Sequence, residues 1–394
     1  MHVVRTFGHL VGGTLLVSGT SIGVGMLALP VATAAGGFFP ALSVYILCWL
    51  FMLCTGLLIL EACIWMPKEA NLITLTSRLL GKWGKVSCWI LYLFLFSCLM
   101  VAHVTGGGDV VKQLSQDNLS SWLSTLLYVV VFAPVVYLGT LWVDRLNLIL
   151  MSGVILTYLL FVSTSISHVE PTLLLRVDWS KAWLALPVVF TAFGYQSLIP
   201  TLYNYMNRNI AKVRFAIILG ITIPLFIYVI WEFLILGIIP YEGHGGLREA
   251  LATGASAVSP LGGYVHNKTL LTFGRAFSFF ALTTSFLGIA IAFVDFLSDG
   301  LKVKKTPLHK FGLCLLIFGI PTIITWINPH LFLIALGLAG GYGVAILLGA
   351  FPILMVWAGR YYQGHSLLHQ QLPGGKLTLV LLMLFVLIEL YITI

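Results

Sequence analysis

Eleven long apolar runs, separated by short polar stretches, constrain this sequence more than any other feature. Crossing the ~30 Å hydrocarbon core of a bilayer takes about 20 apolar residues in a helix. Only 9% of the 394 residues are charged, whereas a soluble domain carries roughly 25%. The sequence therefore predicts an all-α polytopic membrane protein with eleven transmembrane helices. The expected spans are 8–35, 39–66, 86–111, 122–141, 147–166, 182–205, 214–238, 270–297, 311–327, 331–358 and 376–394.

Lysine and arginine residues indicate how these spans are oriented, because cytoplasmic loops are enriched in them. The loops on the side of the N-terminus carry fifteen of the 21 basic residues, and the other loops carry six. We therefore expect a cytoplasmic N-terminus and a periplasmic C-terminus. The fifteen are Arg5, Lys68, Arg78, Lys82, Lys85, Arg145, Arg208, Lys212, Arg214, Lys302, Lys304, Lys305, Lys310, Arg360 and Lys376. The first run ends near "VATAA", which resembles a signal-peptide cleavage site, but its length and glycine content favour a retained span.

The charge and cysteine patterns exclude several kinds of partner. The net charge of +8 is spread over short loops, so we expect no nucleic acid. The six cysteines lie in apolar runs without the spacing of a disulfide framework or a zinc site. We expect no cofactor, and the expected partners are the lipid bilayer and a small molecule. The sequence does not indicate an oligomeric state.

Two stretches between runs have helical character. Residues 71–85 carry an apolar stripe that suits the membrane interface, and residues 246–256 fit a short helix over the opposite face. Ordinary solvated loop helices explain both stretches equally well.

The first apolar run is weakest at its centre. The stretch "VSGTSIGVGMLALP" holds Thr20, Ser21, Gly23 and Gly25 before a proline, although glycine costs about 1 kcal/mol relative to alanine inside a helix. A similar stretch, "VFTAFGYQSLIP", lies in the sixth run, and Thr191 follows Thr20 by 191 − 20 = 171 residues. Five crossings separate the two, so the second copy has the opposite orientation, as in transporters with inverted repeats.

Broken helices at membrane depth are tolerated only where they line a cavity or are buried in protein. The freed amides and the positive end of a half-helix suit a carboxylate, and the freed carbonyls suit an ammonium group or a cation. The two breaks together therefore favour an amino acid as the ligand. The alternative is that the small residues only permit close helix packing.

These two motifs resemble those of the bacterial hydroxy/aromatic amino acid permeases, and the likeness covers essentially the whole chain. The resemblance implies a leucine-transporter-like fold in one domain, 1–394, with broken helices 1 and 6. It further implies two inverted five-helix repeats, about 8–166 and 182–358, and an extra helix, 376–394. Members import an aromatic or hydroxylated amino acid with a coupling cation, proton or sodium, across the bacterial inner membrane. We expect tyrosine as substrate, with tryptophan or phenylalanine as further candidates.

The resemblance also implies the site residues. Amides around Ser21, Gly23 and Gly25 would hold the substrate carboxylate, and carbonyls near Thr20, Phe190 and Thr191 its ammonium. Phe190, Phe193 and Tyr195 of the sixth run would wall the side-chain pocket, with Met100, His103 and Val104 of the third run opposite. The implied substrate-binding set is Thr20, Ser21, Gly23, Gly25, Met100, His103, Val104, Phe190, Thr191, Phe193, Gly194 and Gln196. A hydroxyl-bonded structural histidine is the alternative for His103.

Five oxygen ligands resemble the sodium site of sodium-coupled members of this fold. They are the carbonyls of Gly19, Ile22 and Ala281 and the hydroxyls of Thr284 and Ser285. Hydroxyls that bond back to their own helix are the alternative. The sequence does not decide whether the coupling ion is a proton or sodium.

Acidic residues inside the runs need a partner or a role. We expect Glu61 to accept hydrogen bonds from amides near Gly194 and Gln196, or else to pair with Lys68. Glu232 is a proton-relay candidate, or else an interfacial residue. Glu389 has no role that the sequence suggests.

Other functions fit less well. A serine or threonine symporter of the same family is the alternative transporter. A membrane-embedded transferase would need paired aspartates on two segments, and only Asp295 and Asp299 on one run approach that. We therefore expect no enzymatic activity.

Overall fold

The computed structural model describes residues 2–67, 70–116, 118–265, 267–303, 306–365 and 369–394. Within these ranges every regular element is a helix, and ten helices are long and apolar enough to cross a membrane, or eleven when one bent pair is counted as a span. The predicted all-α class and number of spans are confirmed. Lys68, Lys304 and Lys305, which entered the orientation argument, lie outside the described residues.

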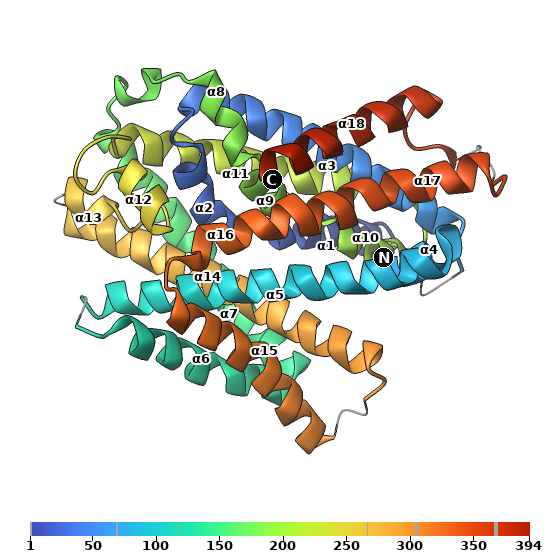
Figure 1. Cartoon of the computed structure of the whole chain (residues 1–394), viewed down its shortest axis with the longest axis horizontal. Coiled ribbons are helices and arrows are strands. Elements are labelled where there is room, and N and C mark those ends of the chain that lie inside the picture. The colour runs from blue at the N-terminus through green and yellow to red at the C-terminus, as the bar shows by residue number, and fades with distance from the viewer. Residues whose placement is uncertain (1, 68–69, 117, 266, 304–305, 366–368) are drawn as a thin grey trace.

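Most spans are single helices, and they run roughly along the long axis of the molecule in Figure 1. They are α3 Phe38–Ile64, α5 Gly81–Leu114, α6 Ser121–Leu138, α7 Thr140–Ser165, α11 Ile210–Ile238, α14 Lys268–Gly300, α15 Pro307–Ile327 and α18 Gly375–Thr393. The tenth span consists of α16 Leu331–Leu338, the π-helix η5 Ala339–Ala350 and α17 Phe351–Tyr361.

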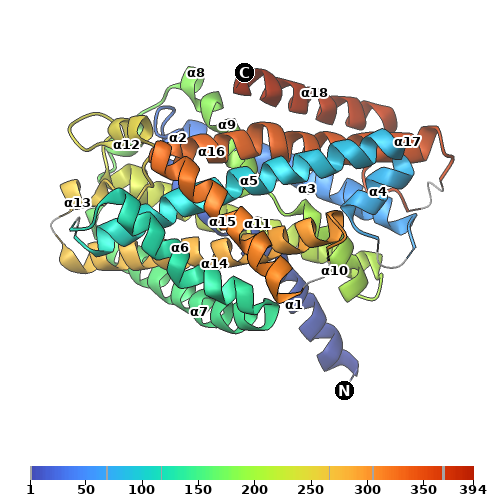
Figure 2. The same cartoon turned by 60° about the horizontal axis from the view of Figure 1, so that its bottom comes forward.

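The first span is broken where the sequence predicts it. Helices α1 His2–Ser21 and α2 Val24–Thr33 meet at 50°, and Figure 2 shows α1 projecting from the bundle. Gly23 between them is extended, with φ −170°, so its backbone needs no left-handed conformation. The reason for glycine is close approach, since a Cβ on Gly23 would lie 2.7 Å from the Ser285 hydroxyl.

The sixth span is broken as well. It comprises α8 Trp179–Ala182, η3 Trp183–Ala185, α9 Leu186–Ala192, η4 Gln196–Leu198 and α10 Ile199–Tyr205. The chain leaves the helix at residues 193–195, within the predicted motif. Helix α9 packs against α2, and a Cβ on Gly25 would lie 2.8 Å from Ala192 Cα. The two breaks are therefore brought side by side by small residues.

The two helices expected outside the spans are confirmed. Helix α4 Leu72–Leu79 is capped by the Asn71 side chain, which accepts from Thr74 N–H at 2.9 Å. Helix α12 Leu247–Thr253 packs against α2, and the amide of Ala257 after it donates to the Leu27 carbonyl at 2.9 Å. Figure 1 places α12 and α4 at opposite ends of the molecule. The segment that follows α12 thus bonds to the first turn of α2, close to the break.

The outer surface of the bundle is apolar. Side chains such as Leu141, Leu148 and Phe226 are exposed on α7 and α11, where a soluble protein would present charge. Because exposed apolar area of this extent is normally covered, the spans fit a lipid environment.

Candidate substrate site

One tyrosine ties the two helix breaks together. The hydroxyl of Tyr228, on α11, lies 2.5 Å from the Ser21 carbonyl and 2.8 Å from the Ala192 carbonyl. These carbonyls end α1 and α9, and no amide of the described chain donates to either. Helix ends leave carbonyls without an intrahelical donor, and Tyr228 offers its one hydroxyl hydrogen to the two carbonyls that the breaks set free. The tyrosine is fully buried.

The first turn of α2 presents free amides. Within the described chain no acceptor receives the amides of Gly23, Val24 or Gly25, although Met26 N–H donates to the Gly23 carbonyl at 3.2 Å. Free amides at a helix start carry the positive end of the helix dipole and suit an anion. All three residues line a cavity of about 110 Å³. This arrangement fits the carboxylate position expected from the sequence.

This central cavity lies between the broken spans, α5, α14 and the tenth span. Its lining residues are Thr20, Ser21, Gly23, Val24, Gly25, Tyr92, Leu95, Phe96, Leu99, His103, Thr191, Gly194, Ser197, Ser285, Ile289, Val344 and Leu348. None of these side chains is an acid, a lysine or an arginine. Eight predicted residues are brought together here: Thr20, Ser21, Gly23, Gly25, His103, Thr191, Gly194 and, from the expected ion site, Ser285.

His103 joins α5 to α14 at the cavity wall. Its Nδ1 donates to the Leu99 carbonyl at 2.6 Å, because a carbonyl oxygen only accepts. In the neutral ring Nε2 is then the acceptor, and it lies 2.9 Å from the Ser285 hydroxyl. His103 is thus bonded to a hydroxyl, as the structural alternative expects, and it also lines the cavity, while its contact with substrate stays a prediction.

The aromatic wall predicted from the sixth span is wrong. Phe190 faces away and packs against Phe51 and Phe385, at 5.2 Å and 5.9 Å between ring centroids. Phe193 packs between Tyr45 and Tyr228. These rings lie behind the break and stabilise it from outside the cavity.

Four further predicted residues also point elsewhere. Tyr195 donates from its hydroxyl to the Met52 carbonyl at 3.2 Å. Gln196 accepts from Tyr195 N–H at 2.9 Å and donates to Thr55 Oγ1 at 3.1 Å. Met100 and Val104 are buried in a core cluster beside α6 and α15. None of the four lines the central cavity.

The aromatic side chains of the cavity come from α5 instead. Tyr92 and Phe96 stack at 5.8 Å and line the wall with Leu95 and Leu99. Neither ring belongs to the set expected from the sequence, because both lie in a third run that is apolar over most of its length. Tyr92, Phe96 and His103 follow one another at helical spacing, and this stripe is the sequence feature that would have indicated a cavity-lining face.

The expected cation ligands are only partly gathered. Gly19, Thr284 and Ser285 line a second cavity of about 470 Å³ that shares Thr20, Phe96, Ser197, Ser285 and Ile289 with the central one. Thr284 Oγ1 donates to the Ala281 carbonyl at 3.0 Å, which is the back-bonding alternative. Ile22 and Ala281 line neither cavity.

The structure corrects the expectation that Glu61 bonds to amides of the sixth span, while the alternative partner, Lys68, lies outside the described residues. Arg360 of α17 donates from Nε and from its terminal nitrogen to the two carboxylate oxygens at 2.6 Å and 2.7 Å. Gln371 N–H donates to the same carboxylate at 2.8 Å. Both charged side chains are buried. Glu61 therefore joins α3 to the tenth span and does not reach the amides of the sixth.

Two other buried acids have hydroxyl partners. Glu232 accepts from the hydroxyl of Tyr45 at 2.7 Å and from that of Thr33, so it is a buried link between α11, α3 and α2, and the interfacial alternative is wrong. Glu389 on α18 accepts from the Thr393 hydroxyl at 3.4 Å. It lies against the π-helix, since a Cβ on Gly341 would strike Thr393.

Comparison with known proteins agrees with this geometry. The tryptophan/tyrosine permease family matches residues 7–393. The "Tyrosine-specific transport system 1" of Haemophilus influenzae is 31% identical, over 95% of this chain and 93% of the relative. The "Tryptophan-specific transport protein" of Pseudomonas aeruginosa is also 31% identical, over 95% and 92%.

Solved structures share the fold at low identity. A manganese transporter of Eremococcus coleocola matches with a TM-score of 0.63 at 13% identity, covering 97% of this chain and 84% of that one. MhsT in complex with L-phenylalanine matches with a TM-score of 0.60 at 13% identity, covering 96% and 98%. The chain is thus a multi-pass membrane transport protein rather than an enzyme, and it belongs to the tryptophan/tyrosine permease family.

Proposed function

We propose that this protein imports an aromatic amino acid, with tyrosine favoured over tryptophan and phenylalanine, by cation symport with alternating access. The observation that carries the proposal is the meeting of two helix breaks at one cavity. Free amides of Gly23, Val24 and Gly25 face it from one side, and Tyr92 and Phe96 face it from the other. The zwitterionic group of an amino acid suits the first side, and an aromatic ring suits the second.

The lining supports an uncharged side chain in the substrate. A buried charge without a partner is costly, and the central cavity offers no acid, lysine or arginine. The relatives named above are described as tyrosine-specific and tryptophan-specific, and this supports the same substrate class. Serine or threonine would leave the apolar wall of Tyr92, Leu95 and Phe96 without a partner.

Alternating access is supported by how the cavities connect. The larger cavity extends from the central one along Leu15, Leu16 and Met151, on the side where α1 projects (Figure 2). At the other end α12 covers α2. We take this as a state open toward the N-terminal face, which the distribution of basic residues assigns to the cytoplasm of a bacterial inner membrane.

Two candidate sites compete for the coupling ion. Sodium would use the carbonyls of Gly19, Ile22 and Ala281 with the hydroxyls of Thr284 and Ser285, whereas a proton would use Glu232. Glu61 is the weaker candidate, because Arg360 already neutralises it.

The double substitution Thr284→Ala with Ser285→Ala distinguishes sodium coupling from proton coupling. Substrate affinity is measured against sodium concentration at fixed pH, and against pH without sodium. Loss of a sodium response, by the typical coupling of about 1–3 kcal/mol, assigns sodium to this site. A response to pH that survives the double substitution and disappears in Glu232→Gln assigns the proton instead.

The experiment that tests the function is uptake of labelled tyrosine into proteoliposomes, with each of the twenty amino acids as competitor. Tyrosine, tryptophan and phenylalanine should compete best. Stronger competition by arginine or glutamate would contradict the assignment of the central cavity.

A further inference from the structure

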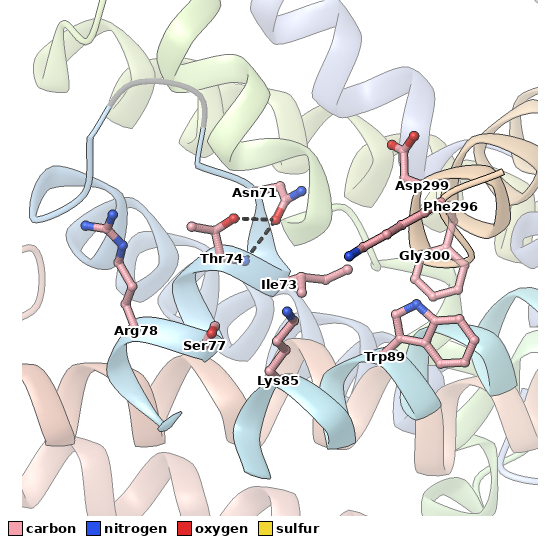
Figure 3. A pocket seen from close by; sticks show the side chains of 11 residues that line it. Asn71, Ile73, Thr74, Ser77, Arg78, Lys85, Trp89, Phe296, Asp299 and Gly300 are labelled. Carbon is pink, nitrogen blue, oxygen red and sulfur yellow. Dashed lines mark hydrogen bonds between the residues drawn. The ribbon is translucent and has the colours of Figure 1, made fainter. Parts of the chain in front are cut away.

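A separate cavity of about 460 Å³ lies between α4, the beginning of α5 and the end of α14 (Figure 3). Its size falls in the range of small-molecule sites. Its lining residues are Asn71, Ile73, Thr74, Ser77, Arg78, Lys85, Trp89, Phe296, Asp299, Gly300 and Lys302. Neither the expected substrate site nor the expected ion site includes any of them. We call it the vestibule cavity.

The vestibule cavity carries an excess of positive charge. Arg78, Lys85 and Lys302 line it together with one acid, Asp299. The two ion pairs within the described part of the chain join other residues, so no described carboxylate lies within 4 Å of these three cations. Figure 3 shows Lys85 extending from α5 toward Ile73, with Trp89 beside it and Asp299 on the α14 side. Positive and negative groups thus approach one space from two helices.

The same faces of two helices line both this cavity and the central one. On α5, Lys85 and Trp89 face the vestibule cavity, and Tyr92 and Phe96, which follow at helical spacing, face the central cavity. On α14 the corresponding residues are Phe296 for the vestibule cavity and Ile289 for the central one.

A cluster of rings separates the two cavities. Phe296 lies 5.4 Å from Trp89, 5.6 Å from Tyr92 and 5.5 Å from Phe96 between ring centroids. A molecule that leaves the central cavity past these rings therefore meets the vestibule cavity next.

We propose that the vestibule cavity is a second, weaker site for the transported aromatic amino acid on the N-terminal side of the ring cluster. This inference rests on the proposed function. Lys85 and Lys302 bind the carboxylate, Asp299 binds the ammonium group, and the half-buried ring of Trp89 contacts the aromatic ring, while Arg78 adds positive charge at the far side of the cavity. The headgroup of an anionic phospholipid shares only the first of these interactions, and Asp299 would repel its phosphate.

The test is the double substitution Lys85→Gln with Lys302→Gln, and the matched control is Lys82→Gln. Lys82 is an exposed cation on the same helix as Lys85 that does not line the cavity. Tyrosine transport is measured in membrane vesicles of both orientations. From the N-terminal face the double variant should raise the KM by about threefold to tenfold, because charges at the rim of a site govern capture. From the opposite face its KM and maximal rate should match the control.

Three results overturn the inference. One is an unchanged KM on both faces in a double variant that still transports tyrosine. Another is an equal change in the Lys82→Gln control, which would indicate only a general surface charge effect. The third is an effect seen in proteoliposomes that contain phosphatidylglycerol but not in those of phosphatidylcholine alone, since the cavity would then hold a lipid headgroup. Failure of the unaltered protein to transport any aromatic amino acid would instead contradict the proposed function.

Discussion

Replacing Tyr228 with phenylalanine tests whether the two helix breaks act as one unit. The substitution keeps the ring, which packs against Phe193 at 5.1 Å between centroids, and removes only the hydroxyl. The carbonyls of Ser21 and Ala192 then lose the hydroxyl that lies 2.5 Å and 2.8 Å away. Because the site is fully buried, water does not replace that donor without rearrangement.

The free-energy cost of Tyr228→Phe follows from the number of hydrogen bonds that the hydroxyl can donate. One hydroxyl hydrogen serves one carbonyl at a time, so the substitution removes one net hydrogen bond and leaves a buried acceptor unsatisfied, at a cost of about 1–2 kcal/mol. A cost of that size is a factor of roughly 5–30 in an equilibrium. If the bond keeps both breaks in the arrangement that binds substrate, the competent fraction falls and the KM for tyrosine rises by that factor.

Tyr158→Phe is the matched control for this substitution. Tyr158 on α7 donates its hydroxyl to the Ile227 carbonyl at 3.0 Å, so it also contacts α11 but not a helix break. Thermal unfolding in detergent and tyrosine uptake are measured for both variants. Both should unfold at a lower temperature, and only Tyr228→Phe should raise the KM. An unchanged KM in Tyr228→Phe, with a loss of stability equal to that of the control, refutes the reasoning.

Two further predictions concern the small and charged residues. Gly25→Val should abolish uptake while the protein still inserts, because a Cβ there would lie 2.8 Å from Ala192 Cα; near-normal uptake at equal membrane abundance contradicts this. Glu61→Gln should destabilise the fold by about 3–5 kcal/mol, since it leaves Arg360 buried without its carboxylate. Adding Arg360→Gln should recover part of that stability in thermal unfolding. No recovery would mean that the Glu61–Arg360 ion pair does not stabilise the packing of α3 against α17.

The sequence predicts the positions of the breaks well because a break is a local property. Hydroxyl and glycine residues in the middle of an apolar run weaken a helix wherever the run lies, and both breaks fall within the quoted motifs. The cavity residues next to the breaks, such as Gly23 and Thr191, were found for the same reason. Repeat symmetry, ion coupling and the orientation of the termini remain predictions.

The direction in which a side chain points depends on neighbours that are distant in the sequence. Phe190 lies one turn from the cavity but faces α3 and α18, where Phe51 and Phe385 receive it. The partner of Glu61 is 299 residues away in the sequence, on α17. Apolar runs carry no period that shows how each helix is rotated about its axis, so these contacts could not be derived from the pattern.

The buried polar contacts divide the helices around the cavity into two groups. Tyr228 and Glu232 join α11 to α1, α2, α3 and α9, whereas His103 and Thr105 join α5 to α14 and α15. The central cavity lies between the two groups, and each of these hydrogen bonds lies within one group, so a movement of one group against the other leaves them intact. Gly23 faces Ser285 across the boundary between the groups, and a Cβ on Gly23 would lie 2.7 Å from the Ser285 hydroxyl. Glycine there lets the groups close on a substrate, and for this reason Gly23→Ala should be partly rescued by Ser285→Gly.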